Sequence, residues 1–497
     1  MGKYDVAIIG SGLGGLVCGY ILSKFGYKVV ILEKHYQFGG CLQTFRRNGI
    51  NYDTGMHYVG SMDEGQVLYR YFKYLNLLDD VKLRKLDESG FDTISIKGEI
   101  YKIPMGYDNF VDGLSQQFPD ERQNLEHYIH SIREVAKESP LNNIEEIDDN
   151  FFLSPYTVKS SVNEFINSIT DNEVLRNVLA GNLPLYAGLQ DKTPMYIHTL
   201  IHNFYIQSAY RLVGGGDSIA KSLVNSITKF GGEVLTDSEV VKIHCNDEKA
   251  VYVELKNGEK IEADSFISNI HPQLTLEKLD TPLIRKAYRE RVTNLENTIS
   301  NYTVYIKFKK DTVHYLNSNF YYYATENVWE CGKYTDKDWP LNYLFMHQVP
   351  ETHIEFSEGA LLIAYMRYDE VAKWADTQVG RRGDDYIEFK ERKSKQLLEM
   401  LEKSFPGILA NIESYSSSSP LTYENYTGTK HGSMYGIVRD KNFPTQTLVS
   451  QRTRIPNLFM TGQNINSHGI LGVTIGSIIT CSEYVGINTI IKDINKI

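Results

Sequence analysis

One glycine-rich turn constrains this chain more than any other feature, the segment 10–15 with the sequence GSGLGG. It follows an apolar run at residues 4–10, which is typical of a buried parallel strand. Apolar residues then recur at helical spacing over residues 13–21, and a second apolar run at 27–33 predicts another strand. In this strand–turn–helix–strand context, G-x-G-x-x-G predicts a βαβ unit that binds a dinucleotide.

Each residue of the turn has its own expected role. Gly10 allows the tight turn, Gly12 lets the backbone approach a pyrophosphate, and Gly15 lets helix and strand pack closely. The start of the helix presents free N–H groups and the positive end of its dipole to the phosphates. Glu33 ends the second strand, where its carboxylate can accept hydrogen bonds from ribose hydroxyls. That carboxylate would repel a 2′-phosphate, so NADP is disfavoured at this site.

Length and composition exclude several other classes of protein. A chain of 497 residues is too long for one compact core, so two or more domains are expected. The net charge of −10 argues against a nucleic-acid surface. The five cysteines are scattered without a C-x-x-C pair, which favours a reducing compartment and predicts no metal site. No secretory signal and no run of about 18 apolar residues is visible, so a cytoplasmic location is expected.

Secondary-structure patterns alternate along the chain. Helical periodicity dominates residues 65–78, 109–138 and 149–207, and an α/β pattern returns at 213–243. Asn257-Gly258 predicts a hairpin, followed by a separate buried strand at 264–269. Further strands are expected at 302–308, 318–325, 341–347, 360–367 and 457–461, a helix at 384–405, a short polar loop at 416–419, and a glycine-rich helix at the end. Pieces of the dinucleotide domain therefore lie at the start, in the middle and at the end of the chain.

A second glycine pair distinguishes between dinucleotides. Gly39-Gly40 follows Glu33-Lys34 closely, as in flavoproteins that hold FAD in an extended form, and residues 53–57 read DTGMH. Together these residues resemble the E-K-x-x-x-x-G-G … D-x-G-x-H pattern of the phytoene desaturase and carotenoid isomerase superfamily of FAD-dependent oxidoreductases, which includes the retinol saturases.

The resemblance runs the length of the chain, through residues 212–220, 231–243, 263–272, 421–436 and 457–476. The sequences GMHYVG and TGQ are most similar to the retinol saturases. One departure is Gln463, which stands where many relatives carry an aspartate that binds a ribityl hydroxyl. An amide can still bind a hydroxyl, so FAD binding is expected to survive, although the altered charge is expected to shift the redox potential.

The turn and the resemblance together give the residues expected to hold FAD. The backbone of Val240 would contact the adenine, and a helix starting near Leu471 would direct its N–H groups at the N1/C2 edge of the flavin. The full set is Gly10, Gly12, Leu13, Gly14, Gly15, Glu33, Lys34, Gly39, Gly40, Cys41, Asp53, Gly55, His57, Val240, Asn269, Gly462, Gln463, Gly472 and Val473.

The resemblance also implies an architecture. It is an α/β fold in which a Rossmann-type FAD-binding domain is interleaved with a substrate domain of antiparallel sheet and helices, similar to the amine oxidases and the GDP-dissociation inhibitors. The expected FAD-binding domain comprises residues 1–62, 208–272 and 440–497. The expected substrate-binding domain, with its helical portion, comprises residues 63–207 and 273–439.

The implied activity is oxidoreduction at C=C bonds of a hydrophobic conjugated isoprenoid or polyene lipid, by hydride transfer at flavin N5. Saturation, desaturation and cis–trans isomerisation all stay open. No second G-x-G-x-x-G is apparent, so a nicotinamide or other external electron donor would bind transiently, or the redox change would cancel within one cycle. Such a substrate partitions into bilayers, which implies peripheral membrane contact, although no amphipathic stretch supports it. The oligomeric state is left open.

The acid/base candidates are His57, Tyr58, His202 and Tyr435. His198 and His202 are four residues apart and share a helix face, where a role in the substrate pocket competes with simple packing. Further options are Tyr205, Lys430, His431 and His468. The 35 tyrosines suit either a polyene channel or ordinary sheet packing.

Two other functions compete with this one. The Rab escort and GDP-dissociation-inhibitor proteins share the fold and bind prenyl lipids without redox chemistry. The glycine-rich block at 462–476 argues against such a carrier, which has no need of a flavin cradle. A flavin amine oxidase usually carries R-G-G-R after the ribose acid, whereas residues 38–41 here read FGGC.

Overall fold

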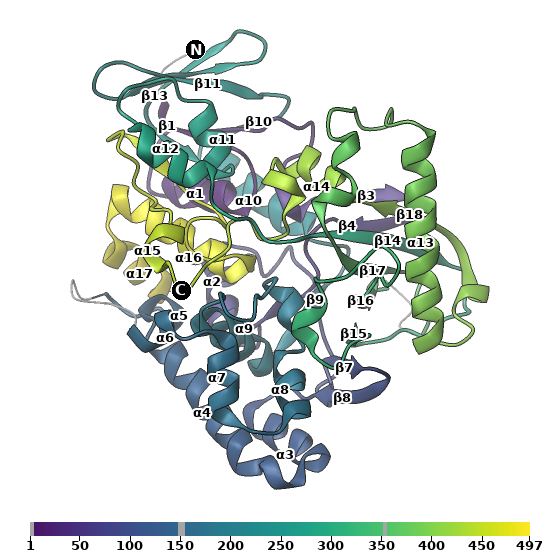
Figure 1. Cartoon of the computed structure of the whole chain (residues 1–497). Helices are drawn as coiled ribbons and strands as arrows, with labels where there is room; N and C mark the ends of the chain where they lie inside the picture. Colours follow the sequence, from purple (N-terminus) through teal and green to yellow (C-terminus); the bar gives the residue numbers. More distant parts are fainter. Residues whose placement is uncertain (1–3, 148–154, 351–354) are drawn as a thin grey trace.

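A computed structural model describes residues 4–147, 155–350 and 355–497 (Figure 1). Its first sheet has seven strands, five of which run parallel in the order β10-β2-β1-β13-β19. Strand β13 also pairs antiparallel with β12, and β12 with β11. The bounds are β1 (Tyr4–Ile9), β2 (Val29–Leu32), β10 (Glu233–Leu235), β11 (Val240–Cys245), β12 (Ala250–Leu255), β13 (Lys260–Ser268) and β19 (Leu458–Met460).

Helices cover both faces of this sheet. One face packs against α1 (Leu13–Lys24), α10 (Asp217–Lys229) and α16 (Gly469–Val485), together with α2 (Val67–Tyr74) and α17 (Ile487–Asn495). The other face packs beneath α11 (Pro272–Glu277) and α12 (Lys286–Thr293). Burial on both sides explains why β1 and β2 read as continuous apolar runs rather than alternating ones.

The second sheet also has seven strands, in the order β18-β14-β17-β16-β15-β7-β8. All neighbours are antiparallel except β15 and β7, which are parallel. The bounds are β7 (Asp92–Ile96), β8 (Glu99–Ile103), β14 (Ser300–Phe308), β15 (Asn319–Tyr323), β16 (Asn342–His347), β17 (Gly359–Met366) and β18 (Ile412–Ser418).

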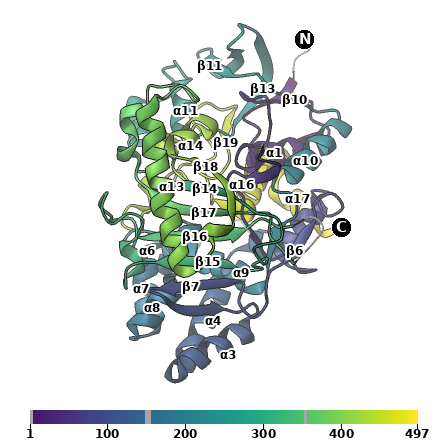
Figure 2. The ribbon, with the colours of Figure 1, turned by 90° about the vertical axis from the view of Figure 1, so that its right-hand side faces the viewer.

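The helix α13 (Asp384–Ser404) lies across one face of this second sheet (Figure 2). The opposite face packs against a helical layer at the lower end of Figure 1. Its members are α3 (Tyr107–Gln117), α4 (Arg122–Lys137), α7 (Val162–Ile169), α8 (Glu173–Ala180) and α9 (Met195–Gln207). In β14 the alternation predicted at 302–308 is present, yet both faces are buried because each has a helical cover.

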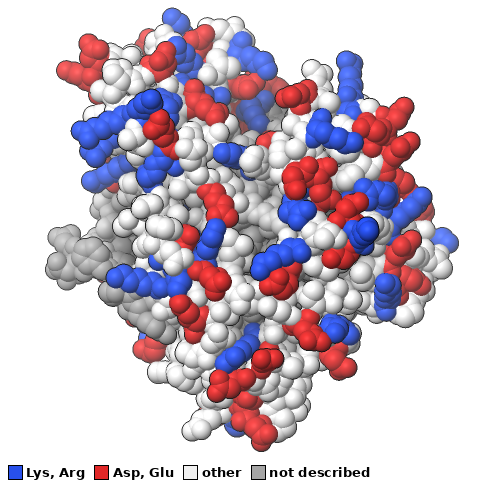
Figure 3. All heavy atoms as spheres, viewed as in Figure 1, with Lys and Arg blue, Asp and Glu red and all other residues white. Residues whose placement is uncertain are grey.

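Smaller elements connect these layers. They are the hairpin β3 (Thr44–Arg47) and β4 (Ile50–Asp53), the sheet of β5 (Val59–Gly60), β9 (Ala209–Leu212) and β6 (Leu83–Lys85), and the short helices α5 (Pro140–Asn143), α6 (Pro155–Lys159), α14 (Pro420–Thr427) and α15 (Pro444–Thr447). On the face shown in Figure 3, basic and acidic side chains are interspersed.

The predicted α/β class, with an interleaved antiparallel sheet and helices, is confirmed. Two local predictions are wrong. The polar stretch at 416–419 is mostly strand, because its backbone pairs with β14 and its serine hydroxyls bind Tyr302 and Tyr305. The strand at 264–269 is not separate, because it continues the hairpin strand as β13.

The first sheet draws its strands from residues 4–32, 233–268 and 458–460, and the division into two domains stays a prediction. Within the described residues, no single helix is long and apolar enough to cross a membrane. Only α16 and α17 pass that test as a pair, and they are bent by 117°.

Candidate active site

The turn after β1 packs tightly on itself. Gly10 has a φ of +93°, in the left-handed region that favours glycine. A Cβ on Gly15 would lie 2.1 Å from the Gly10 carbonyl oxygen, so only glycine lets α1 sit this close to β1. A Cβ on Gly14 would lie 2.5 Å from Oδ1 of Asn269. A Cβ on Gly12 would meet only the Asn269 Nδ2, at 3.0 Å. Gly12 is therefore open on one side.

A buried network behind the turn holds Glu33 in place. Its Oε2 accepts hydrogen bonds from the Ser11 backbone N–H at 2.9 Å and from the Ser11 hydroxyl at 2.6 Å. The Gly39 N–H donates to the Ser11 hydroxyl at 3.1 Å. The motif marks Ser11 only as an unspecified position, so sequence reasoning missed its part in joining the turn, the acid and the Gly39-Gly40 pair.

A cavity of about 470 Å³ runs along this turn toward α16. It brings together most of the residues predicted to hold FAD, from stretches that are far apart in the chain. They are Gly10, Gly12, Leu13, Gly14, Glu33, Lys34, Gly39, Gly40, Cys41, Gly55, His57, Val240, Asn269, Gly462, Gln463 and Val473. We refer to this cavity as the cofactor cleft. Asn301, Ser433 and Met434 also line it, and no motif singled them out.

Three predicted residues do not line the cofactor cleft. Gly15 and Gly472 lie one layer behind it, where a Cβ on Gly472 would come within 2.7 Å of the Ser467 side chain. Asp53 accepts a hydrogen bond from the Gly216 N–H at 2.8 Å and so caps the start of α10. Burial raises the pKa of the Asp53 carboxyl to about 7. These three support the cleft rather than form its wall.

The far end of the cofactor cleft is the first turn of α16. Gly469, Ile470 and Val473 line the cleft there. The preceding loop is held by Arg439, whose guanidinium donates to the carbonyls of Asn464, Ile465 and Asn466 at 2.8–3.3 Å. Arg439 matches no motif, because an arginine that binds backbone carbonyls leaves no pattern in the sequence.

The residues present fit an extended FAD. Neither α1 nor α16 has a side-chain cap at its N-terminus or an acidic residue in its first turn. Both therefore present unpaired N–H groups to the cofactor cleft, as anionic phosphates and an electron-rich flavin edge require. The open side of Gly12 leaves room for a pyrophosphate, and Gly40 packs closely against this glycine, since its Cβ would lie 3.0 Å from the Gly12 Cα.

A second cavity, of about 560 Å³, opens from the flavin end of the cofactor cleft. The two share Gly55, Met56, His57, Tyr435, Gly469 and Ile470. Its walls are mostly apolar side chains of α9 and α16, including Ile197, Leu200, Ile201, Phe204, Leu471, Ile475 and Ile479. We refer to it as the apolar cavity. A hydrophobic molecule in it would reach the end of the cofactor cleft.

Two of the acid/base candidates lie where these cavities meet. The buried Nδ1 of His57 has no hydrogen-bond partner among the described residues. Burial, and then the charge of Arg211, lower the pKa of His57 to about 4, so its imidazole is neutral at neutral pH. The Tyr435 hydroxyl donates to the Pro184 carbonyl at 3.0 Å, and its ring packs 4.4 Å from that of His468.

Tyr58 lines the apolar cavity, but its hydroxyl points into the protein. It donates to Asp92 at 3.0 Å and lies 2.6 Å from the Tyr321 hydroxyl. Burial raises the pKa of Asp92 to about 7, although Asn319, Tyr58 and Asn182 donate to it. Tyr58 therefore supports the wall of the apolar cavity.

His202 lies away from both cavities. The Tyr128 hydroxyl bridges it to His198, at 2.8 Å from the His202 Nδ1 and 2.9 Å from the His198 Nε2. Burial lowers the pKa of His202 to about 3, so it is neutral. These contacts are compatible with the packing role considered for this pair, although the buried Nε2 of His202 has no hydrogen-bond partner among the described residues. The described residues contain no cluster of three or more His, Cys, Asp or Glu side chains suited to a metal ion.

Sequence comparisons agree with this arrangement. The all-trans-retinol 13,14-reductase of Homo sapiens is 28% identical over 100% of this chain and 87% of its own length. The same enzyme of Danio rerio is 26% identical over 97% of this chain and 86% of its own length. The prolycopene isomerase 1 of an Oncidium hybrid cultivar is 24% identical over 96% of this chain and 83% of its own length.

Solved structures share the fold. An oxidoreductase from Methanosarcina mazei superposes with a TM-score of 0.65 at 18% identity, covering 96% of this chain and 99% of that one. A putrescine oxidase gives a TM-score of 0.63 at 15% identity over 97% and 99%. The family model of flavin containing amine oxidoreductases matches residues 13–472. The chain is therefore an FAD-dependent oxidoreductase and belongs to the flavin containing amine oxidoreductase family.

Proposed function

We propose that this protein acts on the C=C bonds of a hydrophobic conjugated isoprenoid or polyene lipid. The observation that carries the proposal is the apolar cavity, which meets the cofactor cleft at His57, Tyr435 and Ile470. A long apolar molecule suits such a pocket, because burying its surface is favourable and most of the wall is apolar. The relatives described above are a reductase of all-trans-retinol and an isomerase of prolycopene.

In this proposal the cofactor-binding set predicted from the sequence holds FAD, which when bound supplies hydride transfer at its N5. The side chains of α9 and α16 bind the polyene and exclude water from the reacting end. His57 and Tyr435 lie at that end. The neutral His57 imidazole, with its unpartnered Nδ1, is available to hydrogen bond with cofactor or substrate. The Tyr435 ring packs against a flat conjugated chain, and burial holds the pKa of its phenol above the ordinary value.

The same proposal includes an external electron donor, a nicotinamide or another reductant, when the net reaction is saturation. It also includes peripheral contact with a membrane.

Two exposed apolar side chains support the proposed membrane contact. Leu448 lines the apolar cavity and is 53% exposed, and the nearby Phe443 is 52% exposed. Cosedimentation with phosphatidylcholine vesicles tests this contact, and Leu448→Ser with Phe443→Ser should weaken it.

Product analysis tests the proposed reaction. FAD-loaded protein, reduced with dithionite, is incubated anaerobically with retinol, a carotene and a cis-carotene, and the products are separated by chromatography and weighed by mass spectrometry. The proposal predicts a product that differs from its polyene by two hydrogens or by double-bond geometry. A preparation without flavin absorbance near about 450 nm would instead favour the lipid carrier. Turnover of amines with no change in any polyene would favour an amine oxidase.

A further inference from the structure

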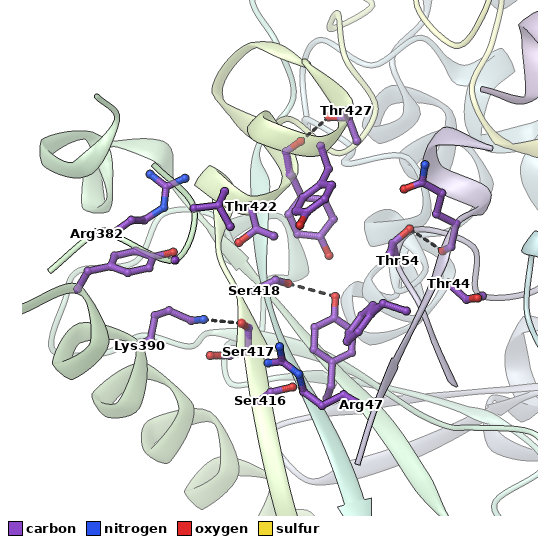
Figure 4. A pocket seen from close by; sticks show the side chains of 18 of the residues that line it. Thr44, Arg47, Thr54, Arg382, Lys390, Ser416, Ser417, Ser418, Thr422 and Thr427 are labelled. Carbon is purple, nitrogen blue, oxygen red and sulfur yellow. Dashed lines mark hydrogen bonds between the residues drawn. The ribbon is translucent and has the colours of Figure 1, made fainter. Parts of the chain in front are cut away.

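A third cavity, of about 790 Å³, lies beside the cofactor cleft and shares no lining residue with the apolar cavity. Its walls include residues of strands β3 and β18 and of helices α13 and α14 (Figure 4). The residues that it shares with the cofactor cleft are His35, Gly40, Cys41, Gln43, Thr54, Tyr423, Tyr426 and Thr427. A ligand bound in this third cavity would therefore lie side by side with the cofactor.

This cavity is lined by three cationic side chains from two different parts of the chain, namely Arg47, Arg382 and Lys390 (Figure 4), and also by Arg46, next to Arg47. The Arg382 guanidinium donates to the carbonyls of Trp374 and Thr377. The Lys390 amine donates to the Ser417 carbonyl at 2.5 Å. Across residues 4–147, 155–350 and 355–497, none of the three cations has a carboxylate within ion-pair distance.

The cations also act on one another. Burial first, and then the charges of Arg47 and Arg382, lower the pKa of Lys390 to about 8. Two carboxylates line the same cavity. Glu391 is paired with Lys395 at 3.4 Å and accepts from the Tyr415 hydroxyl, while Asp384 lies in the first turn of α13. Like charges gathered without a counter-ion cost free energy, which a bound anion would recover.

Other groups in this cavity suit a nucleotide. The hydroxyls of Ser416 and Ser417 lie beside the cations and can bind phosphate or ribose oxygens (Figure 4). Tyr36 and Tyr426 are exposed and offer ring faces on which a base can stack, although one face of Tyr426 already stacks on His35. Tyr36 is 74% exposed, so the protein itself does not cover it.

We propose that Arg47, Arg382 and Lys390 bind the phosphate groups of a soluble nucleotide that docks beside the cofactor cleft. Its use as electron donor rests on the function proposed above, whereas the phosphate binding does not. As donor, a reduced pyridine dinucleotide gives up a hydride from its nicotinamide ring and leaves oxidised. That hydride and one proton from solvent reduce the flavin.

Calorimetry on the FAD-loaded protein tests the phosphate binding, with ADP, NADPH and inorganic pyrophosphate as probes. Lys390→Met keeps the aliphatic stem, and Arg47 is exposed on a hairpin, so Lys390→Met and Arg47→Gln should both fold. Each should weaken binding about tenfold, as expected for one charge-assisted hydrogen bond. Lys403→Met, on α13, and Arg381→Gln, next to Arg382, lie outside the cavity and should bind as the parent protein does. Absence of binding in the parent protein, or equal affinity in the cavity variants, overturns the proposal.

Anaerobic mixing of the FAD-loaded protein with NADPH tests whether a nucleotide in this cavity donates electrons to the flavin or only binds there. Loss of flavin absorbance that slows in Lys390→Met and Arg47→Gln identifies an electron donor. Binding that depends on the two residues but leaves the flavin oxidised overturns the donor role and supports a nucleotide that is not a reductant. If photoreduced protein fails to react with any polyene while nucleotide binding still depends on Lys390, the proposed function fails and this site stands.

Discussion

Substituting two glycines of one turn should separate cofactor binding from folding. Gly12 has φ −60° and ψ 170°, which any residue adopts, and a Cβ there would meet only a flexible amide nitrogen at 3.0 Å. A Cβ on Gly15 would lie 2.1 Å from a backbone oxygen that cannot move away alone. Gly12→Ala should therefore remove FAD from a folded protein, whereas Gly15→Ala should weaken the fold itself.

The contact distances set the expected magnitudes. To relieve the Gly15→Ala contact, α1 and β1 must separate by about 1 Å, a shift in a packed core that typically costs about 1–3 kcal/mol or more. Gly12→Ala requires a shift of a few tenths of an ångström in one side chain, so the free energy of unfolding without FAD should change by less than about 0.5 kcal/mol. FAD at 100 times its Kd should raise the free energy of unfolding of the parent protein by about 2.7 kcal/mol and leave that of Gly12→Ala unchanged.

Urea unfolding followed by tryptophan fluorescence, with and without added FAD, measures both effects. Flavin released from each purified variant by heat gives the occupancy. The reasoning fails if Gly12→Ala retains full flavin occupancy. It also fails if the two variants lose equal stability in the absence of FAD, since the two glycines would then be packed equally tightly.

Three further predictions follow from other parts of the site. Leu200→Trp should fill part of the apolar cavity, so the KM for a polyene should rise at least about tenfold while flavin occupancy stays unchanged. An unchanged KM would show that the substrate binds elsewhere. His202→Asn should lower the free energy of unfolding by about 1–3 kcal/mol, because a buried hydrogen bond is lost, and should change kcat by less than about twofold. A large loss of kcat at full flavin occupancy would instead make His202 a catalytic candidate again. Burial raises the pKa of Asp53 to about 7, so its protonated form stabilises the fold below its ordinary pKa and that contribution is lost as pH rises toward 7. Asp53→Asn should therefore flatten the fall in unfolding free energy between about pH 4 and 7, and an unaltered pH profile would contradict the buried carboxyl.

The cofactor end of the molecule could be predicted from sequence because each requirement falls on a single residue type. The left-handed turn requires glycine at position 10, and the close contact between helix and strand requires glycine at position 15. An acidic side chain that can bind a ribose follows at Glu33, so all three lie in one short segment. The sheet that joins them could also be predicted, because strands buried on both faces leave continuous apolar runs.

The reacting end could not be predicted in the same way, because its properties depend on contacts between distant segments. His57 and Tyr435 both line that end, whereas His202 is an equal candidate by sequence. The packing of α9 against α4 places His202 beside Tyr128 instead. Strand β18 reads as a polar loop because serine has a low strand propensity, and its pairing with β14 overrides that preference. Arg439 was missed because it binds backbone carbonyls, which no side-chain pattern reveals.

The most direct test of the central claim is anaerobic mixing of photoreduced, FAD-loaded protein with a panel of polyenes, followed at the flavin absorbance near about 450 nm. If the protein reduces conjugated lipids, at least one polyene should reoxidise the flavin in a saturable manner, and Leu200→Trp should slow that reaction. If no polyene reoxidises the flavin or changes double-bond geometry, while a non-polyene substrate turns over, the assignment of the apolar cavity to a conjugated lipid is wrong.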